Sequence, residues 1–457
     1  MSTSFEDLRT ARPDTTDDHQ AHQMQPVAPA ADLPGPPEHD HHGPEQMSGD
    51  RRHGNGGEPH GGEDHGGNGH GGDGPDGPDP HHGHSMSSDV TRPQLAVVTA
   101  LTVLALALAV ALPALKVNLG LSAEDVGGAI MPPGMVMTRE TSAEAMRDMA
   151  AVDPDAVTAA APATAHGDQP LQPRLEGVVK AFDLTVAVTG WTILPGRRVD
   201  AYAVNGQVPG PRLRVTQGDR VRIHVHNQLP EATSIHWHGL ILPNVMDGAA
   251  DVTQEPIPPG GSHTYEFTAR QHGTFFYHSH AAPDRQQALG LYGALLIDPK
   301  NPAVDTAYGY EHEAVVQLQE WLTRDGLTYP AMLMEGALPN YFTINGKAYP
   351  ETETIRMRVG ERIRVRFIGS HNNFVHPMHI HGGPFRIVQT DGERIPPGAQ
   401  LLKDTVNVGP GERYDVIWQA LEPGKWLLHC HIPHHTTNDN AEEQGGGGLM
   451  AVIEVSP

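Results

Sequence analysis

Four histidine clusters are the most chemically distinctive feature of this sequence of 457 residues. Each cluster contains a His-x-His pair, and on a β-strand both side chains of such a pair point to the same face because side chains alternate. The eight paired histidines are His236, His238, His278, His280, His379, His381, His429 and His431. Strands that converge could present all eight imidazoles to one point between two domains, and imidazole is a common transition-metal ligand.

The only cysteine, Cys430, lies between His429 and His431. A single cysteine excludes an intrachain disulfide and the Cys-rich structural zinc sites. Alternation sends the Cys430 side chain to the face opposite the two flanking histidines, so one strand can contact two metal centres. With His376 and His435, Cys430 completes a His2Cys set, which suits a type 1 blue copper ion that transfers electrons.

Histidine pairs are weak evidence singly, because many are structural or bind zinc. Four pairs in order, with the only cysteine inside one of them, argue against a set of ordinary surface histidines. A further pair, His224 and His226, occupies a strand-like phrase whose counterpart later in the chain carries Arg364 and Arg366. We interpret this further pair as an ordinary polar strand face.

The first 92 residues form a low-complexity tail rich in His, Gly and Asp. Such a segment cannot bury enough apolar surface to offset its ordering entropy, so we expect it to be disordered. It is either a plain solvated tail or a loose copper or zinc buffer.

Residues 93–116 contain an uncharged apolar run, which predicts a single transmembrane helix of roughly 30 Å. The alternative is a buried Ala-rich helix. Arg92 and Lys116 flank the run and balance each other, so the positive-inside rule gives no orientation.

Residues 117–176 form a connector with a short helix expected at 142–149. Its methionines are interpreted as residues of ordinary helix packing or of a disordered segment rather than as copper(I) ligands, and no site is assigned to them. They are Met131, Met135, Met137, Met146 and Met149.

From residue 177 onward, short alternating apolar runs are separated by Gly and Pro turns, which is typical of an all-β sandwich or Greek-key barrel. The runs divide near residues 298–302, which predicts one domain over 177–302 and another over 303–457. Related phrases at 215–227 and 357–369 indicate that the two domains are repeats of one β-unit.

The four clusters resemble the copper-binding motifs of multicopper oxidases, the family of laccases, ascorbate oxidase, bilirubin oxidase and cuprous oxidases. The resemblance covers about residues 177–457 and implies two cupredoxin-like Greek-key β-sandwich domains that hold copper. By this resemblance His236 and His379 correspond to type 2 ligands, and His376, Cys430 and His435 to type 1 ligands. The remaining six paired histidines correspond to ligands of the binuclear type 3 pair, so that each active unit would hold four copper ions. Asp247 resembles the acidic residue that supplies protons during oxygen reduction, although an Asp-Gly pair is more commonly only a turn.

Two features depart from the family pattern. The loop after His435 is longer than usual, so the axial type 1 position could be Leu449 or Met450. Alignment on the preceding glycine favours Leu449, whereas sulfur chemistry favours Met450. The spacing between His280 and His376 leaves no room for the middle domain of three-domain laccases. The chain therefore resembles two-domain laccases with the type 1 copper in the second domain, which implies a homotrimer with each cluster built across a subunit interface.

The resemblance implies a laccase-like oxidase that couples one-electron oxidation of a small reducing substrate to four-electron reduction of dioxygen to water. The substrate could be a phenol, an aromatic amine or a metal ion. Alternatives are a copper nitrite reductase-like enzyme and a copper-sequestering or copper-resistance protein. The net charge of -24 argues against nucleic-acid binding. We expect a single-pass cell-membrane protein with its oxidase domains outside the cytoplasm.

Overall fold

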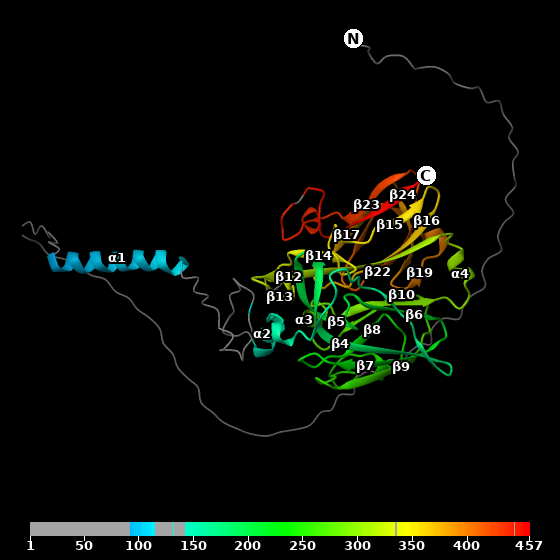
Figure 1. Cartoon of the computed structure of the whole chain (residues 1–457), viewed down its shortest axis with the longest axis horizontal. Coiled ribbons are helices and arrows are strands. Elements are labelled where there is room, and N and C mark those ends of the chain that lie inside the picture. Colours follow the sequence, from blue (N-terminus) through cyan, green and yellow to red (C-terminus); the bar gives the residue numbers. More distant parts are fainter. Residues whose placement is uncertain (1–91, 115–130, 132–141, 334–335, 443) are drawn as a thin grey trace, which may run out of the picture. The chain divides into compact units, whose positions relative to one another are not determined.

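The computed structural model describes residues 92–114, 131, 142–333, 336–442 and 444–457 (Figure 1). Apart from Arg92, the predicted tail over residues 1–92 lies outside these residues. The same is true of most of the first half of the connector, including Met135 and Met137.

A helix, α1 (Arg92–Ala114), coincides closely with the predicted helix over residues 93–116. Within the described part of the chain, no helix combines the length and the apolar character that a membrane crossing requires. The predicted transmembrane helix is therefore not confirmed.

The short helix expected in the connector is α2 (Ala143–Met149). Ser142 caps it, since the Ser142 hydroxyl accepts a hydrogen bond from the Ala145 amide at 3.1 Å. Met146 and Met149 are both buried, so these two methionines pack the helix against its surroundings. The other short helices are α3 (Pro283–Gln286) and α4 (Ala303–Thr306).

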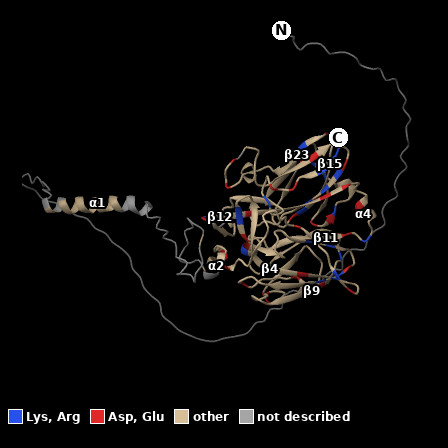
Figure 2. Cartoon of the chain, viewed as in Figure 1, with Lys and Arg blue, Asp and Glu red and all other residues tan. Residues whose placement is uncertain are grey.

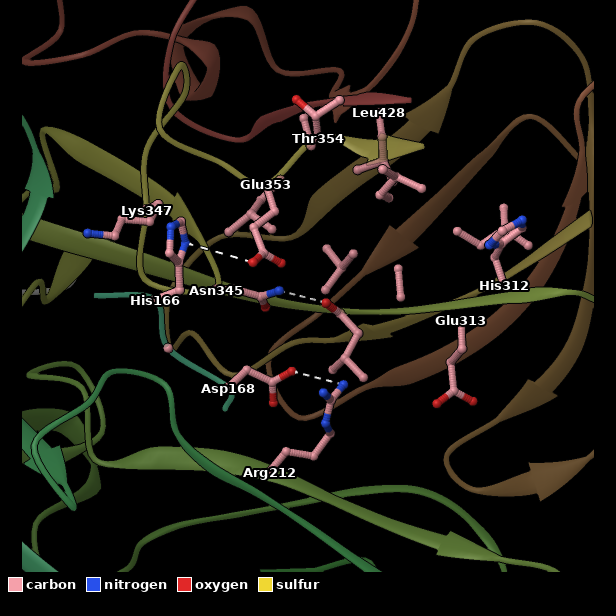
Figure 3. Close-up of a pocket in the computed structure, with 18 of the residues that line it drawn as sticks. His166, Asp168, Arg212, His312, Glu313, Asn345, Lys347, Glu353, Thr354 and Leu428 are labelled. Carbon is pink, nitrogen blue, oxygen red and sulfur yellow. Dashed lines mark hydrogen bonds and ion pairs between the residues drawn. The ribbon is translucent and has the colours of Figure 1, made fainter. Parts of the chain in front are cut away.

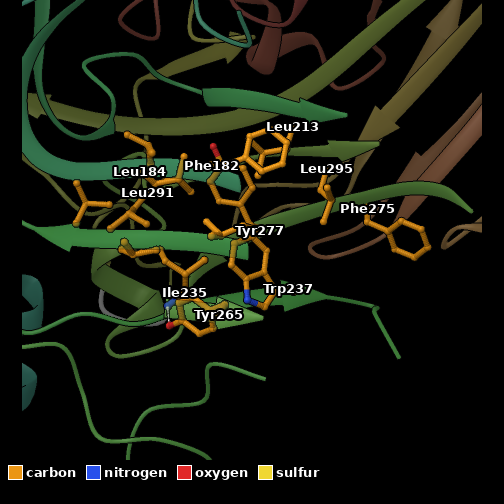
Figure 4. Packing of buried hydrophobic residues seen from close by; sticks show 14 of the residues in the cluster. Phe182, Leu184, Leu213, Ile235, Trp237, Tyr265, Phe275, Tyr277, Leu291 and Leu295 are labelled. Carbon is orange, nitrogen blue, oxygen red and sulfur yellow. Dashed lines mark hydrogen bonds between the residues drawn. The ribbon is translucent and has the colours of Figure 1, made fainter. Parts of the chain in front are cut away.

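The first β-sandwich has two sheets of mixed parallel and antiparallel strands. One sheet follows the order β1-β4-β7-β9 with β3 and β5 paired to β4, and the other follows β2-β6-β11-β10-β8. The strands are β1 (Ala159–Ala160), β2 (Pro170–Leu171), β3 (Arg174–Glu176), β4 (Val179–Leu194), β5 (Arg197–Val204), β6 (Gly210–Thr216), β7 (Arg220–Asn227), β8 (Ile235–His238), β9 (Ser262–Thr268), β10 (Gly273–Ser279) and β11 (Tyr292–Asp298). Alternate apolar residues of both sheets form one core, in which Trp237 packs against Tyr265 and Tyr277 (Figure 4).

The second β-sandwich repeats this architecture. One sheet follows the order β13-β12-β16-β22-β18-β19 with β14 and β20 paired to it, and the other follows β15-β24-β23-β17-β21. The strands are β12 (His312–Arg324), β13 (Leu327–Tyr329), β14 (Tyr341–Ile344), β15 (Ile355–Arg358), β16 (Arg362–Ile368), β17 (His376–Ile380), β18 (Phe385–Thr390), β19 (Glu393–Arg394), β20 (Leu402–Lys403), β21 (Thr405–Val408), β22 (Arg413–Gln419), β23 (Gly424–Cys430) and β24 (Met450–Ser456). The predicted boundary near residues 298–302 falls in the connection between β11 and β12.

The two sandwiches share a buried interface. An apolar cluster contains Trp191 and Val208 from the first sandwich and Trp321 and Tyr341 from the second. The Trp191 indole N–H donates a 2.7 Å hydrogen bond to the Gly346 carbonyl, which satisfies a polar atom inside this cluster. The two sandwiches therefore pack against each other through a shared apolar interface.

A buried ionic network also joins the sandwiches, although charged residues of both signs are otherwise interspersed over them (Figure 2). Asp415 accepts hydrogen bonds from Arg364 at 2.6 and 2.9 Å and from Arg366 at 3.0 Å. It also accepts one at 2.6 Å from the Thr274 hydroxyl on β10. Asp415, Arg364 and Arg366 are at most 2% exposed. The two arginines therefore differ from His224, which is exposed, and His226, which is half-buried.

Glu313 extends this network toward the first sandwich. It pairs with Arg366 and with Arg214, both at 2.8 Å. Burial would raise the pKa of Glu313, but the guanidinium groups of Arg366 and Arg214 outweigh burial and lower that pKa to about 2. The carboxylate therefore remains charged across the physiological range.

The network generates a stability prediction. Asp415→Asn removes the shared anion of two buried guanidinium groups. Removing one partner of a buried ion pair costs about 3–5 kcal/mol, and we expect the low end of that range because Arg364 keeps Asp305 and Arg366 keeps Glu313. Calorimetric and denaturant unfolding should show a loss of that size. Asp183→Asn is the matched control, because Asp183 pairs with Arg174 on the exposed surface and should contribute little. Equal losses for the two variants would contradict the assignment.

Candidate metal centres

The first group of imidazoles lies in the first sandwich. His236 and His238 lie on β8 and flank Trp237, whose side chain enters the core, so the two imidazoles point the other way. Strand β10 pairs with β8 so that His278 lies opposite His236, and His280 follows β10. The ring centre of His236 lies 5.3 Å from those of His278 and His280 and 5.6 Å from that of His238. These four imidazoles form the first imidazole group.

The second imidazole group lies in the second sandwich and is built the same way. His379 on β17 pairs with His429 on β23, and His381 and His431 follow the ends of these strands. The ring centre of His379 lies 5.0 Å from that of His381 and 5.7 Å from those of His429 and His431. Each sandwich therefore supplies four imidazoles from two adjacent antiparallel strands.

Backbone carbonyls orient the corresponding histidine of each group. The Nδ1 atom of His236 lies 2.7 Å from the Asp247 carbonyl oxygen, and Nδ1 of His379 lies 2.7 Å from the Asp404 carbonyl oxygen. A histidine whose Nδ1–H donates to a carbonyl keeps Nε2 free as a ligand atom. The Asp247 carboxylate also lies 3.6 Å from Nδ1 of His236, so Asp247 borders the first imidazole group.

The two groups do not meet within one chain. Among the described residues, every ring contact between these eight histidines joins members of the same group. The expectation that all eight imidazoles reach one point is therefore not met by a single copy of the chain.

A third set of ligand atoms consists of His376, Cys430 and His435. The Cys430 sulfur lies 3.8 Å from Nδ1 of His376 and 3.6 Å from Nδ1 of His435, and the two Nδ1 atoms are 3.0 Å apart. All three side chains are almost fully buried. Two imidazole nitrogens and one sulfur at these distances fit the donor set of a type 1 copper ion.

Burial sets the protonation of this third set. It raises the pKa of the Cys430 thiol to about 12 and lowers the pKa values of His376 and His435 to about 3. The histidines are therefore neutral, as ligands must be. The thiol proton would be released when a metal binds.

Strand β23 connects the third set with the second imidazole group. His429 pairs with His379, whereas Cys430 pairs with the buried Met378, so neighbouring residues face opposite sides of the sheet. The same register separates Leu449 from Met450. Met450 pairs with His429, whereas the Leu449 carbonyl accepts the Cys430 amide at 3.0 Å, which places Leu449 on the face of Cys430.

Sequence reasoning missed two buried residues beside His376. Glu320 on β12 lies 3.2 Å from Nε2 of His376, and the His371 ring centre lies 4.3 Å from that of His376. All three are at most 1% exposed. The only signal in the sequence that could have pointed to Glu320 is an acidic residue among the largely uncharged residues of β12.

A cleft of about 610 Å³ opens elsewhere in the protein (Figure 3). Asp168, Arg212, Glu313 and Glu353 contribute to its lining, which includes none of the predicted metal ligands. Burial raises the pKa of Asp168 to about 7. The candidate metal chemistry therefore does not take place in this cleft.

Gly248 generates a prediction about the first imidazole group. Gly248 and Gly260 both have positive φ, at +87° and +74°, where a Cβ costs roughly 1–2 kcal/mol. A Cβ at Gly248 would also overlap the Ile235 carbonyl and lie 3.0 Å from the His236 Cα, whereas one at Gly260 meets nothing within 4 Å. Gly248→Ala should therefore lose more unfolding free energy than Gly260→Ala and should weaken divalent metal binding. Equal stability and equal metal content would refute this.

Comparison with known proteins agrees with the geometry. Residues 185–302 and 327–442 each match a multicopper oxidase family model. The chain is 33% identical over 307 residues to a copper resistance protein A homolog of Pseudomonas syringae, covering 56% of this chain and 50% of that protein. It is also 33% identical over 269 residues to laccase-1 of Cryptococcus neoformans, covering 53% of this chain and 41% of that protein. The chain thus spans about half the length of these curated relatives.

Among solved structures, a blue copper oxidase from Nitrosomonas europaea is 34% identical with a TM-score of 0.54, covering 61% of this chain and 86% of that chain. This similarity identifies the two sandwiches as a cupredoxin-like fold. The ordered histidine motifs, the strand geometry and both family matches together show that the chain belongs to the multicopper oxidase family, whose members bind copper.

Proposed function

We propose that this protein is a laccase-like oxidase that takes single electrons from a small reductant and uses them to reduce dioxygen to water. The observation that carries the proposal is the placement of Cys430 between His429 and His431 on opposite faces of β23. Copper, when bound, would supply the one-electron redox chemistry at both faces.

The roles of individual residues follow from this placement. His376, Cys430 and His435 would hold a type 1 ion that receives electrons. Covalent bonds along β23 lead directly from Cys430 to His429 and His431, so electrons would have a short through-bond route to the second imidazole group. Asp247, next to His236, would deliver protons to the site of oxygen reduction.

Leu449 rather than Met450 would occupy the axial side of the type 1 site. The register of β23 and β24 supports this, because Met450 lies on the face of His429. A leucine side chain has no ligand atom. The resulting set of three donors favours the reduced ion and a high reduction potential.

A homotrimer would explain how two separate imidazole groups form one site. The first imidazole group of one subunit would face the second imidazole group of its neighbour around a closed ring. Each such interface would then hold a type 2 ion and a type 3 pair. A monomer would have two incomplete halves and no oxidase activity.

The substrate class comprises phenols, aromatic amines and oxidisable metal ions. His435 is fully buried, whereas the adjacent His434 is exposed and its ring centre lies 4.8 Å from that of His435. We therefore propose that reductants donate electrons at the surface near His434 rather than by contact with His435.

Copper resistance is the second candidate function, because the relatives include copper resistance proteins as well as laccases. A nitrite reductase-like activity is less well supported, because the only cysteine lies in the second sandwich and the imidazoles form two groups of four.

Three measurements separate these functions: copper analysis, visible and electron paramagnetic resonance spectra, and oxygen uptake with a phenolic donor. Oxygen uptake with a type 3 absorption band supports the oxidase, whereas bound copper without uptake from any donor supports sequestration.

Cys430→Ser should abolish the blue absorption and lower oxygen uptake by about 100-fold or more. Losing a residue that only supports a metal ligand already costs about 10- to 100-fold. The loss follows because an alcohol cannot replace the thiolate. Met450→Leu is the matched control and should keep both the blue absorption and the reduction potential of the wild type, since Met450 faces away from Cys430. A blue Met450→Leu protein with a raised reduction potential would instead identify Met450 as the axial ligand.

A subunit-mixing experiment tests the ring. His238→Ala inactivates the first imidazole group and His431→Ala the second, so each variant alone should be inactive. Mixed trimers contain some interfaces in which both groups are intact, and random assembly of equal amounts should restore about one quarter of the wild-type activity. Unfolding and refolding the variants separately before mixing provides the control. No recovery in trimers shown to contain both variants would contradict a shared site.

A further inference from the structure

Glu320 is a buried carboxylate for which the proposed electron transfer has so far required no role. It lies on β12 opposite Phe342 of β14, and only 1% of its surface is exposed. A charged group at such a depth is strongly unfavourable unless its oxygens find polar partners. The partners of Glu320 therefore indicate what it does.

The carboxylate is held by the segment that leads into His376. One oxygen accepts the Phe374 amide at 2.9 Å, and the other accepts the Asn373 side-chain amide at 2.7 Å and the Asn373 backbone amide at 3.2 Å. These donors fix Glu320 at a defined position beside β17. They also satisfy the hydrogen-bonding capacity of its oxygens inside the core.

His376 faces two different environments through its two ring nitrogens. Nδ1 points into the third set, 3.0 Å from Nδ1 of His435 and 3.8 Å from the Cys430 sulfur. Nε2 lies 3.2 Å from a Glu320 carboxylate oxygen, a close contact that is not aligned as a hydrogen bond. Nε2 of His376 has no hydrogen-bond partner among the described residues.

We propose that Glu320 is a positioning residue that keeps the proton of His376 on Nε2, leaves Nδ1 free for copper and favours the oxidised ion through its negative charge. Metal-binding histidines commonly use a carboxylate on the second ring nitrogen in this way, which fixes the tautomer and makes the imidazole more basic. This role rests on the proposed function, because it requires a type 1 ion at His376.

His371 closes the site around this pair. It is fully buried, its ring packs edge-on against that of His376, and neither of its nitrogens has a hydrogen-bond partner among the described residues. Its ring forms part of the buried wall around the Glu320–His376 contact. Burial lowers the local dielectric constant, which strengthens the electrostatic effect of the carboxylate.

The test compares Glu320→Gln with Glu313→Gln. Both substitutions remove one negative charge from β12 and keep the side-chain shape, but Glu313 pairs with arginines and contacts none of the three type 1 ligands. Glu320→Gln should weaken copper(II) binding at the type 1 site about tenfold relative to copper(I). For a one-electron couple, a tenfold change corresponds to a rise in reduction potential of about 59 mV. Glu313→Gln should leave the potential within a small fraction of that value.

Glu320→Asp provides a second variant if Glu320→Gln fails to fold. It keeps the charge but withdraws the carboxylate from His376, so copper affinity should fall with a smaller rise in potential. Potentials that are equal in the wild type and both Glu320 variants would overturn the proposal. So would an additional metal ion that is lost from both Glu320→Gln and His371→Leu, because Glu320 would then be a ligand.

The blue absorption and the reduction potential of the protein separate a failure of the proposed function from a failure of the role of Glu320. A wild-type protein that binds copper without any blue absorption would remove the proposed function itself. A blue wild-type protein whose potential is insensitive to Glu320 would leave the oxidase proposal intact and remove only the role of Glu320.

Discussion

The alternation of side chains along β23 is the constraint on which the candidate chemistry depends. His429 must face the second imidazole group while Cys430 faces the buried third set, and adjacent residues of a strand achieve this without any special backbone conformation. The pairing with β17 and β24 fixes the register. A slip by one residue would exchange the two faces and destroy both sites together.

The packing of the sandwiches supports this arrangement. Asp415 is hydrogen-bonded to Thr274 on β10, the strand that also carries His278. The buried ionic network thus holds a strand of the first imidazole group against the second sandwich. The orientation of the two groups within a chain is consequently set by ionic and apolar contacts that contain no ligand residue. In the proposed homotrimer, this arrangement would let the two groups face different neighbours.

Local patterns predicted many elements well. The alternating polar and apolar residues at 220–225, 362–367 and 413–418 predict strands, and these residues lie within β7, β16 and β22. Strand β12 lacks such a clear alternation. Its buried Gln317 and Gln319 interrupt the apolar pattern. The Gln317 side-chain N–H donates to Asp168 and the Gln319 side-chain N–H to the Gln287 carbonyl, both in the first sandwich. These hydrogen-bond partners lie far away in the sequence, so the local alternation of residues does not reveal them.

The sequence by itself determined the ligand types, the pairing of histidines on common faces and the opposite direction of Cys430, because each depends only on residue identity and strand alternation. It also indicated two repeated β-units. Only the tertiary structure decided that the imidazoles form two separate groups, that Leu449 shares the face of Cys430, and that Glu320 lies beside His376. These features depend on strand register and on packing between distant segments, and distances of that kind are fixed only when the whole core assembles.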